Sequence, residues 1–327
     1  MKTICGSKRF VHFLIFVILV LFLIACSQKE STDTSNKELK DKGTIRVSGA
    51  WALYPMMVKW AEEYQKINPK IRIDVSAGGA GKGIADSLAG MVDIGMVSRN
   101  INPAEIKQGA AYVPVVKDAV FPTMNVGNAE AASVLKRGLS HDVFMDLWIL
   151  EKQMTWGQIV KTGSKEKVQV YTRSDACGAA ETWAQYLGKK QEDLKGVAVY
   201  GDPGVAAAIK KDINGIGFNN LNYAYDSKTG LPVTGLQVIP IDVNGNGKID
   251  PQEDLSTKEK AIQSITAGIY PSPPARDLYL MTKNSFKGQA AQFVQWILTD
   301  GQKYVNEVGY IRISEQQIKE AKEKVKP

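Results

Sequence analysis

The sequence is poor in histidine, the side chain that most often moves protons in enzymes. Of its two histidines, His12 lies in an apolar N-terminal segment, so His141 is the only one in the body of the chain. A nucleophile such as Cys177 needs a base beside it, and His141 is far from it in the sequence. No arrangement of serine, histidine and aspartate for acyl transfer can be recognised. We therefore expect a binding protein and not an enzyme.

The excess of positively over negatively charged residues is also small. Lys and Arg together number 41 and Asp and Glu 34, which gives a formal net charge of +7. Three of the basic residues and none of the acidic ones lie in residues 1–25, so the remainder carries 38 against 34, or +4. This mild and scattered excess argues against a nucleic-acid partner.

The apolar run at the N-terminus is too short to cross a membrane as a helix. It covers residues 10–24 and follows a basic start with two lysines and Arg9. This pattern is typical of an export signal. The run ends in Leu-Ile-Ala-Cys, which resembles the lipobox of bacterial lipoproteins and implies cleavage before Cys26 and a diacylglyceryl group on its sulfur. A free cysteine in a truncated anchor helix is the alternative.

These features predict where the protein is found. Residues 1–25 form a signal peptide, and the polar and charged residues 26–42 form a flexible tether. We expect an exported protein that is lipid-anchored on the periplasmic or extracellular face of a bacterial membrane. Cysteine is then too scarce for a disulfide, because Cys5 leaves with the signal peptide, Cys26 carries lipid and Cys177 stays alone.

From residue 43 onward, strand-like runs alternate with amphipathic segments. This alternation is typical of an α/β sheet whose ligands bind at the carboxyl ends of the strands. We expect two lobes, residues 43–124 with 268–327 and residues 125–267, joined by crossing strands. The predicted strands are residues 44–47, 71–75, 92–97, 113–124 and 276–283, and the predicted helices start at 55, follow the glycine-rich 78–83 up to 88, and cover 288–308.

The segment 171–183 carries the clearest chemistry. A strand-like stretch leads into Arg173-Ser174-Asp175, and Gly178 then opens a helix-forming segment. This layout directs backbone N–H groups, the positive end of a helix and a guanidinium at one point, which suits an anion. Asp175 would hold Arg173 in place or accept a proton from the ligand. The alternative is an ordinary turn with a surface arginine and an aspartate cap.

Six stretches in order share the sequence pattern of one family, and they are residues 47–55, 77–84, 93–99, 172–181, 215–218 and 278–310. They resemble the phosphate-binding substrate-binding proteins of ABC importers from residue 43 to about 314. The resemblance implies a two-lobed, periplasmic-binding-protein-like fold of type II. Each lobe would be a mixed, mostly parallel sheet flanked by helices, and the lobes would close over an oxyanion. It also implies a monomer that works with an ABC permease and its ATPase.

Carried over position by position, the resemblance implies a set of ligand-binding residues: Leu53, Tyr54, Ala80, Gly81, Ser98, Arg99, Arg173, Asp175, Cys177, Gly178 and Ala179. Many family members have serine or threonine at four of these positions, here Leu53, Ala80, Cys177 and Ala179. Each donor lost from a charged ligand costs about 1.5–3 kcal/mol. Either Lys82, Arg99 or backbone N–H groups compensate, or the ligand is different.

Two classes of function therefore stay open. The first is anion capture for import, in which Arg173 supplies the charge-assisted hydrogen bonds and Arg99 is the second candidate cation. Phosphate is the first candidate ligand, and another oxyanion or a small carboxylate is the second. The rival class is a surface lipoprotein with a structural or adhesive role and no part in transport.

A second motif covers residues 242–253. Its side chains fit the alternating positions of an EF-hand-type calcium loop, with Gly247 at the sharp turn. The segment before the loop is strand-like, so we expect a lone, stabilising calcium site and not a sensor. An Asn-Gly turn with unrelated acids is the alternative. The predicted calcium ligands are Asp242, Asn244, Asn246, Lys248 through its carbonyl, Asp250 and Glu253.

Overall fold

The structure, a computed structural model, describes residues 43–325, which belong to one folded unit. The predicted signal peptide (1–25), tether (26–42) and lipid-bearing Cys26 lie outside the described residues and stay predictions. Across the described range, no helix combines the length and the apolar character that a membrane crossing requires.

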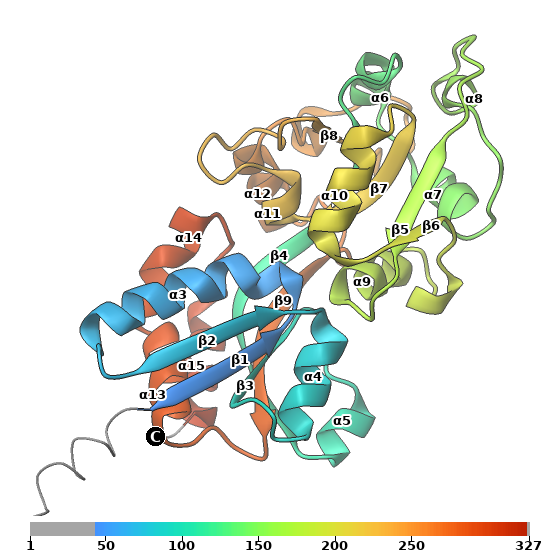
Figure 1. Ribbon diagram of the computed structural model, residues 1–327. Coiled ribbons are helices and arrows are strands. Elements are labelled where there is room, and N and C mark those ends of the chain that lie inside the picture. The colour runs from blue at the N-terminus through green and yellow to red at the C-terminus, as the bar shows by residue number, and fades with distance from the viewer. Residues whose placement is uncertain (1–42, 326–327) are drawn as a thin grey trace, which may run out of the picture. The chain divides into compact units, whose positions relative to one another are not determined.

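The nine strands of the described residues belong to one mixed sheet. They are β1 (Thr44–Gly49), β2 (Arg72–Ala77), β3 (Ile94–Val97), β4 (Ala110–Asn125), β5 (Gln169–Arg173), β6 (Val197–Val199), β7 (Gly215–Asn220), β8 (Leu236–Val238) and β9 (Ala275–Lys283). Their order is β2-β1-β3-β9-β4-β7-β5-β6, with β8 beside β4 (Figure 1). The pairs of β1 with β2 and β3, and of β5 with β6 and β7, are parallel. The predicted mixed α/β class is confirmed.

The strand β4 takes part in both groups of strands. Its residues 110–119 pair antiparallel with β9, residues 120–124 pair with β7, and residues 123–125 pair with β8. The strand predicted at 113–124 is therefore confirmed and is longer than its apolar pattern indicates. With β9 it forms the crossing connection between the two groups (Figure 1).

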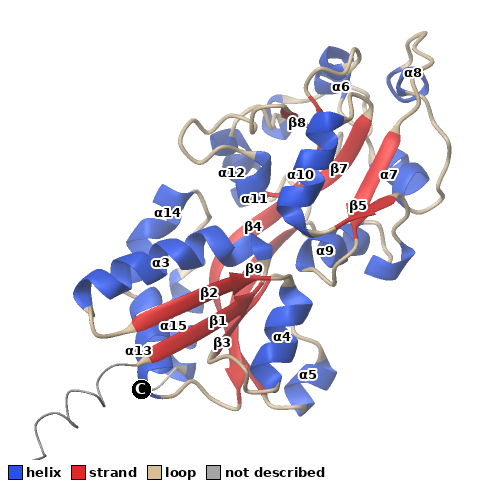
Figure 2. Cartoon of the chain, viewed as in Figure 1, coloured by secondary structure: helices blue, strands red, loops and turns tan. Residues whose placement is uncertain are grey.

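Helices surround both groups of strands (Figure 2). They are α3 (Tyr54–Ile67), α4 (Ala80–Leu88), α5 (Pro103–Lys107), α6 (Ala131–Arg137), α7 (His141–Trp148), α8 (Trp156–Val160), α9 (Gly178–Tyr186), α10 (Gly201–Lys211), α11 (Leu221–Ala224), α12 (Lys258–Thr266), α13 (Gly288–Ile297), α14 (Val305–Val308) and α15 (Glu315–Lys324). The predicted helix that starts at 55 is α3, and the glycine-rich segment leads into α4, whose first turn begins at Ala80.

The helix predicted over 288–308 is wrong as one element. It is divided into α13, a 3-10 segment η4 (Asp300–Tyr304) and α14. The break follows Thr299, which has φ −121° and ψ −98°. Gly301 then packs so closely on Trp60 that the Trp60 Nε1–H donates to its carbonyl at 2.9 Å. This tertiary contact overrides the apolar pattern of the segment.

Two apolar cores lie on either side of the crossing strands. The first core contains buried residues between 45 and 116 and between 278 and 325, and the second contains buried residues between 119 and 275. We call the parts around these cores the first lobe and the second lobe. The chain passes from the first core to the second between residues 116 and 119 and returns between 275 and 278. The predicted boundaries were 124/125 and 267/268, and the division into domains itself stays a prediction.

Glycines bring α4 directly onto the sheet. A Cβ on Gly83 of α4 would lie 2.5 Å from the Met96 carbonyl oxygen and 2.9 Å from the Gly49 Cα. A Cβ on Gly95 would in turn lie 2.5 Å from the Gly83 carbonyl oxygen. Only hydrogen atoms fit between these backbones, so α4 lies close against β1 and β3. The contact fixes the N-terminus of α4 at the carboxyl edge of the sheet.

The substitution Gly83→Ala tests this contact. In an unconstrained helix, glycine to alanine stabilises by about 1 kcal/mol, but here the added methyl group meets backbone atoms. We expect the free energy of unfolding to fall by about 1–3 kcal/mol, as in overpacked cores. Urea unfolding followed by circular dichroism measures it. The control is Gly163→Ala, where no atom lies within 4 Å of the new Cβ. Equal stability of the two variants would contradict the close packing.

Candidate functional site

The turn between β5 and α9 carries Arg173. Arg173 is the last residue of β5, and α9 begins at Gly178 after Cys177, whose Sγ accepts a hydrogen bond from the Ala180 N–H at 3.4 Å. The first N–H groups of a helix have no partner within it. Those of Gly178 and Ala179 therefore lie at the positive end of α9. The predicted strand, loop and helix of this motif are confirmed.

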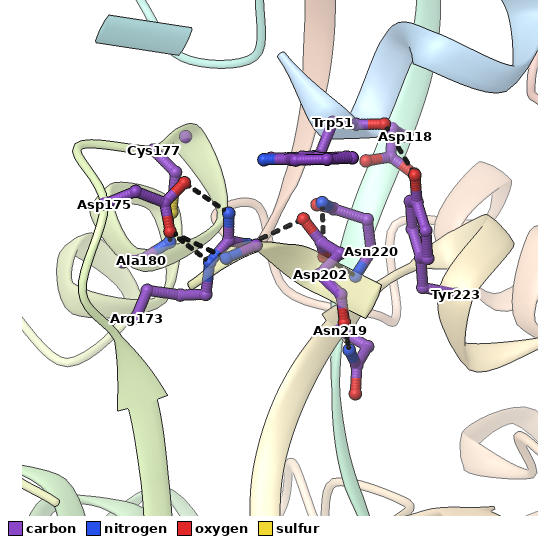
Figure 3. Close-up of polar contacts among 12 residues, drawn as sticks. Trp51, Asp118, Arg173, Asp175, Cys177, Ala180, Asp202, Asn219, Asn220 and Tyr223 are labelled. Carbon is purple, nitrogen blue, oxygen red and sulfur yellow. Dashed lines mark hydrogen bonds and ion pairs between the residues drawn. The ribbon is translucent and has the colours of Figure 1, made fainter. Parts of the chain in front are cut away.

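Arg173 lies between two carboxylates. Its Nε and Nη2 donate to the two oxygens of Asp175 at 2.8 and 2.7 Å, and its Nη1 donates to Asp202 Oδ2 at 2.6 Å (Figure 3). The side chain of Arg173 is 0% exposed. Burial alone would lower its pKa, but the two carboxylates, Asp202 above all, raise the pKa beyond the ordinary value. The guanidinium is therefore permanently charged, and Asp175 orients it as predicted.

Asp202 extends this arrangement to a second arginine. Its Oδ1 accepts from the backbone N–H of Asn220 at 3.2 Å and from Nδ2 of the same residue at 2.8 Å. The Asn220 Oδ1 accepts from Arg276 Nη2, which also donates to Asp118 Oδ2 at 3.3 Å. Arg276 Nη1 donates to the Gly178 carbonyl at 2.9 Å. We call the connected side chains the buried network: Asp118, Arg173, Asp175, Asp202, Asn220 and Arg276.

The buried network holds three carboxylates and two guanidinium groups. Asp118 is 0% exposed and the Arg276 side chain is 8% exposed. Burial raises the pKa of Asp118 to about 6, although Arg276 acts in the opposite direction. Burial likewise lowers the pKa of Arg276 from its ordinary value. The network therefore places charge in a nearly water-free region between the two cores.

Four members of the buried network were not among the predicted site residues. They lie on β4, α10, β7 and β9, far from the 171–183 motif in sequence: Asp118, Asp202, Asn220 and Arg276. Two of them have sequence features that could have marked them as candidates. Asp118 follows Lys117 inside the mostly apolar strand 113–124, and Asp202 lies in the first turn of a helix that follows a strand.

The predicted loops of the first lobe meet the start of α9. The Gly81 N–H donates to the Ala176 carbonyl at 3.1 Å. A Cβ on Gly178 would lie 2.0 Å from the Ser98 carbonyl oxygen, so these two backbones touch. Both Leu53 and the first residue of α4, Ala80, are fully buried. The structure thus brings together three of the predicted positions from both lobes, Gly81, Ser98 and Gly178.

Trp51 covers the buried network from the first lobe. It begins the 3-10 turn η1 (Trp51–Leu53), and its indole lies 3.3 Å from the position of a Cβ on Gly201. The Tyr223 hydroxyl donates to the Trp51 carbonyl at 3.3 Å, and Figure 3 shows the indole lying over Asp202. The ring of Tyr54 is 6.4 Å away in a tilted arrangement. Trp51 therefore lines the boundary between the lobes.

Arg99 does not join the buried network. Its guanidinium forms a bidentate ion pair with Glu105 at 2.7 and 3.0 Å and also donates to the Asn100 carbonyl. It lines a pocket of about 330 Å³ together with Lys117, Gln185 and one member of the network, Arg276. Within the described residues, the second guanidinium that is hydrogen-bonded into the network is that of Arg276, and the role of Arg99 in ligand binding stays a prediction.

Cys177 has a structural role in this arrangement. Burial raises the pKa of its thiol to about 12, even though Arg173 acts to lower it. A thiol with such a pKa stays protonated at neutral pH and is a poor nucleophile. Its sulfur instead accepts from the first turn of α9.

The segment 242–253 folds into a tight loop. Asp242 accepts from the backbone N–H groups of Asn246 and Gly247 at 3.1 and 2.9 Å, and Asp250 Oδ2 accepts from Nδ2 of Asn246 at 3.0 Å. Glu253 Oε1 accepts from the Val243 N–H at 3.0 Å. The carboxylates of the loop therefore accept from backbone N–H groups and from the side-chain amide nitrogens of Asn244 and Asn246.

Carboxylates alone do not form a metal site in this loop. Within residues 43–325 no group of three or more His, Cys, Asp and Glu side chains is arranged to hold a metal ion. Calcium would need the amide oxygens of Asn244 and Asn246 and the Lys248 carbonyl as well. The calcium site stays a prediction.

Comparison with known proteins identifies the family. The PBP superfamily domain matches residues 34–301, so the chain belongs to the PBP superfamily. Among its relatives, the phosphate-binding protein PstS of Methanocaldococcus jannaschii is 27% identical over 289 residues, covering 80% of this chain and 72% of the relative. The phosphate-binding protein PstS of Bacillus subtilis is 23% identical over 320 residues, covering 95% and 96%.

A solved structure confirms the type of fold. A phosphate ABC transporter substrate-binding protein from Clostridium perfringens, solved with bound phosphate, matches with a TM-score of 0.67 at 19% identity. The match covers 83% of this chain and 100% of that chain. The periplasmic-binding-protein-like fold of type II is therefore confirmed. The prediction of a binding protein in place of an enzyme is confirmed at the level of the family.

The raised pKa of Asp118 predicts a pH dependence of stability. Between its ordinary pKa of 3.8 and about 6, the folded protein binds more protons at this group than the unfolded chain does. The free energy of unfolding therefore falls as pH rises through this range. Proton binding by Asp118 stabilises the folded protein fully at pH values below this range. We expect Asp118→Asn to lack this slope. Urea unfolding at a series of pH values measures it, and identical slopes in both proteins would contradict the burial argument.

Calcium binding can be tested by stability as well. If the loop holds Ca²⁺, chelation by EDTA lowers the melting temperature of the wild-type protein, because the ion binds only the folded loop. We expect Asp242→Ala to melt at one temperature with and without chelator. Asp226→Ala, which removes a half-buried turn carboxylate outside the loop, is the matched control and keeps the chelator effect. An unchanged wild-type melt would exclude a stabilising calcium site.

Proposed function

We propose that this chain is the solute-binding protein of an ABC importer and captures a small anion, with phosphate as the first candidate. The observation that carries the proposal is the position of Arg173. Its guanidinium is fully buried beside the N-terminus of α9, where Gly178 and Ala179 present N–H groups, and the N-terminus of α4 lies opposite. Guanidinium and helix N-termini both stabilise anions. The names of the relatives support the same ligand.

Lobe closure gives the proposed capture its mechanism. Loops from the first lobe, at Gly81 and Ser98, touch the start of α9 in the second lobe. A ligand held there would be shielded from water, which strengthens each hydrogen bond to it. A membrane partner that recognises only the closed form would then accept loaded protein in preference to empty protein. An ABC permease with its ATPase fits this role.

A small carboxylate or another oxyanion is the second candidate ligand. The observation that favours it is the loss of hydroxyl donors, because Leu53, Ala80 and Ala179 are buried and offer only their backbones. The indole of Trp51 over the network also suits a ligand with an organic part. The anchoring of the protein by lipid at Cys26 is part of the same proposal, since capture for import requires a position near the membrane.

Titration calorimetry with phosphate, sulfate, molybdate and acetate tests the proposal. We expect heat of binding with at least one of these anions and a loss of affinity of tenfold or more in Arg173→Lys, because lysine cannot form the bidentate pair with Asp175. The control is Arg72→Lys, at a side chain 74% exposed. Circular dichroism verifies folding of each variant. Absence of heat with every anion at millimolar concentration would overturn anion capture and favour the structural or adhesive role.

A further inference from the structure

The Asp202 carboxylate accepts a hydrogen bond from Nη1 of the Arg173 guanidinium. We infer that Asp202 sets the charge of the ligand that this site accepts, by acting as a built-in anion that competes with the ligand for Arg173. The inference rests on the proposed function, and it names a specificity-determining residue on α10 that lies 29 positions from Arg173 in the sequence.

The geometry shows how much of Arg173 remains for a ligand. Asp175 takes Nε and one N–H of Nη2, and Asp202 takes one N–H of Nη1 at 2.6 Å. Each Nη carries a second N–H, and these are the groups left for an anion. Asp202 cannot turn away easily. It is 1% exposed, and its other oxygen is held by two hydrogen bonds from Asn220.

The charge of the buried network points in the same direction. Three carboxylates against two guanidinium groups leave one net negative charge among the hydrogen-bonded side chains before any ligand is present. Charges interact strongly where water is excluded. A fully ionised dianion is therefore disfavoured beside Arg173. A monoanion, or an anion that brings its own N–H or O–H donor for the Asp202 carboxylate, is accepted at a smaller cost.

Asp202 is the member of the network best placed for this role. Asp175 comes from the same loop as Arg173 and orients the guanidinium through two parallel hydrogen bonds. Asp118 pairs with Arg276 and does not touch Arg173. Asp202 alone combines direct contact with Arg173, a position on a different element and a place beneath the Trp51 indole (Figure 3).

The variant Asp202→Asn removes the charge and keeps the shape. Its amide oxygen can still accept from Asn220, and its NH₂ group would then face Arg173 Nη1, leaving that N–H free for an anion. We expect the dissociation constants for both inorganic phosphate and sulfate to fall at least tenfold relative to wild type. The matched control is Asp212→Asn, which removes the same charge at the other end of α10, where the carboxylate accepts from Tyr171. The control should change neither constant more than twofold.

Titration calorimetry at constant pH and ionic strength separates the outcomes. If wild type binds phosphate and folded Asp202→Asn binds it equally or more weakly, the inference is overturned and the proposed function stands. If only the variant binds, the role of Asp202 is upheld and anion capture by the native protein is overturned. If neither wild type nor Asp202→Asn binds phosphate or sulfate, both the inference and the proposed function are overturned. Should Asp202→Asn not fold by circular dichroism, Asp202→Ser is judged by the same criteria.

Discussion

The pairing of Arg173 with two buried carboxylates is the interaction on which the rest of the site depends. Removing an ion from water costs several kcal/mol, and only partners with good geometry offset that cost. Arg173 meets this condition with Asp175 at the start of α9 and Asp202 at the start of α10. Two helices and the end of β5 are therefore fixed by one guanidinium. Loss of Arg173 would leave the carboxylates of Asp175 and Asp202 without their ion-pair partner in the interior.

The same reasoning explains where the lobes meet. Asp118 and Arg276 are cross-strand partners on β4 and β9, at the point where the first core ends and the second begins. The neighbouring cross-strand pair, Lys117 and Asp277, is charged as well, and buried apolar residues of the two cores flank these two pairs. A polar connection between two apolar cores satisfies buried charge while leaving each core closed on itself. The buried network thus lies at the boundary between the lobes and also forms the candidate site.

Much of the fold could be predicted from sequence because its elements have clear periodicity. The strands β1 to β4 and β9 and the helices α3, α4 and α9 all lie within a few residues of their predicted positions. The single helix predicted over 288–308 was wrong, because the contact of Trp60 with Gly301 is tertiary. Helical period alone cannot show that contact.

The site was predictable only where it is local in sequence. Arg173, Asp175 and Gly178 lie in one motif, so their chemistry could be recognised together. Asp202, Asn220 and their partners on β4 and β9 are brought to Arg173 by the topology of the sheet, across separations of 29 residues and more. The sequence also did not show that Arg99 pairs with Glu105, six residues away.

The position of Trp51 has an optical consequence. Trp60, Trp148, Trp156 and Trp183 are completely buried inside the two cores, so their surroundings do not depend on how the lobes meet. Trp51 instead lies against Gly201 of the opposite lobe, and its Nε1 is buried without a hydrogen-bond partner. Separation of the lobes would bring water to this indole alone among those five. The protein therefore carries its own fluorophore at the lobe boundary, and the emission wavelength of Trp51 would report a separation of the lobes without any added label.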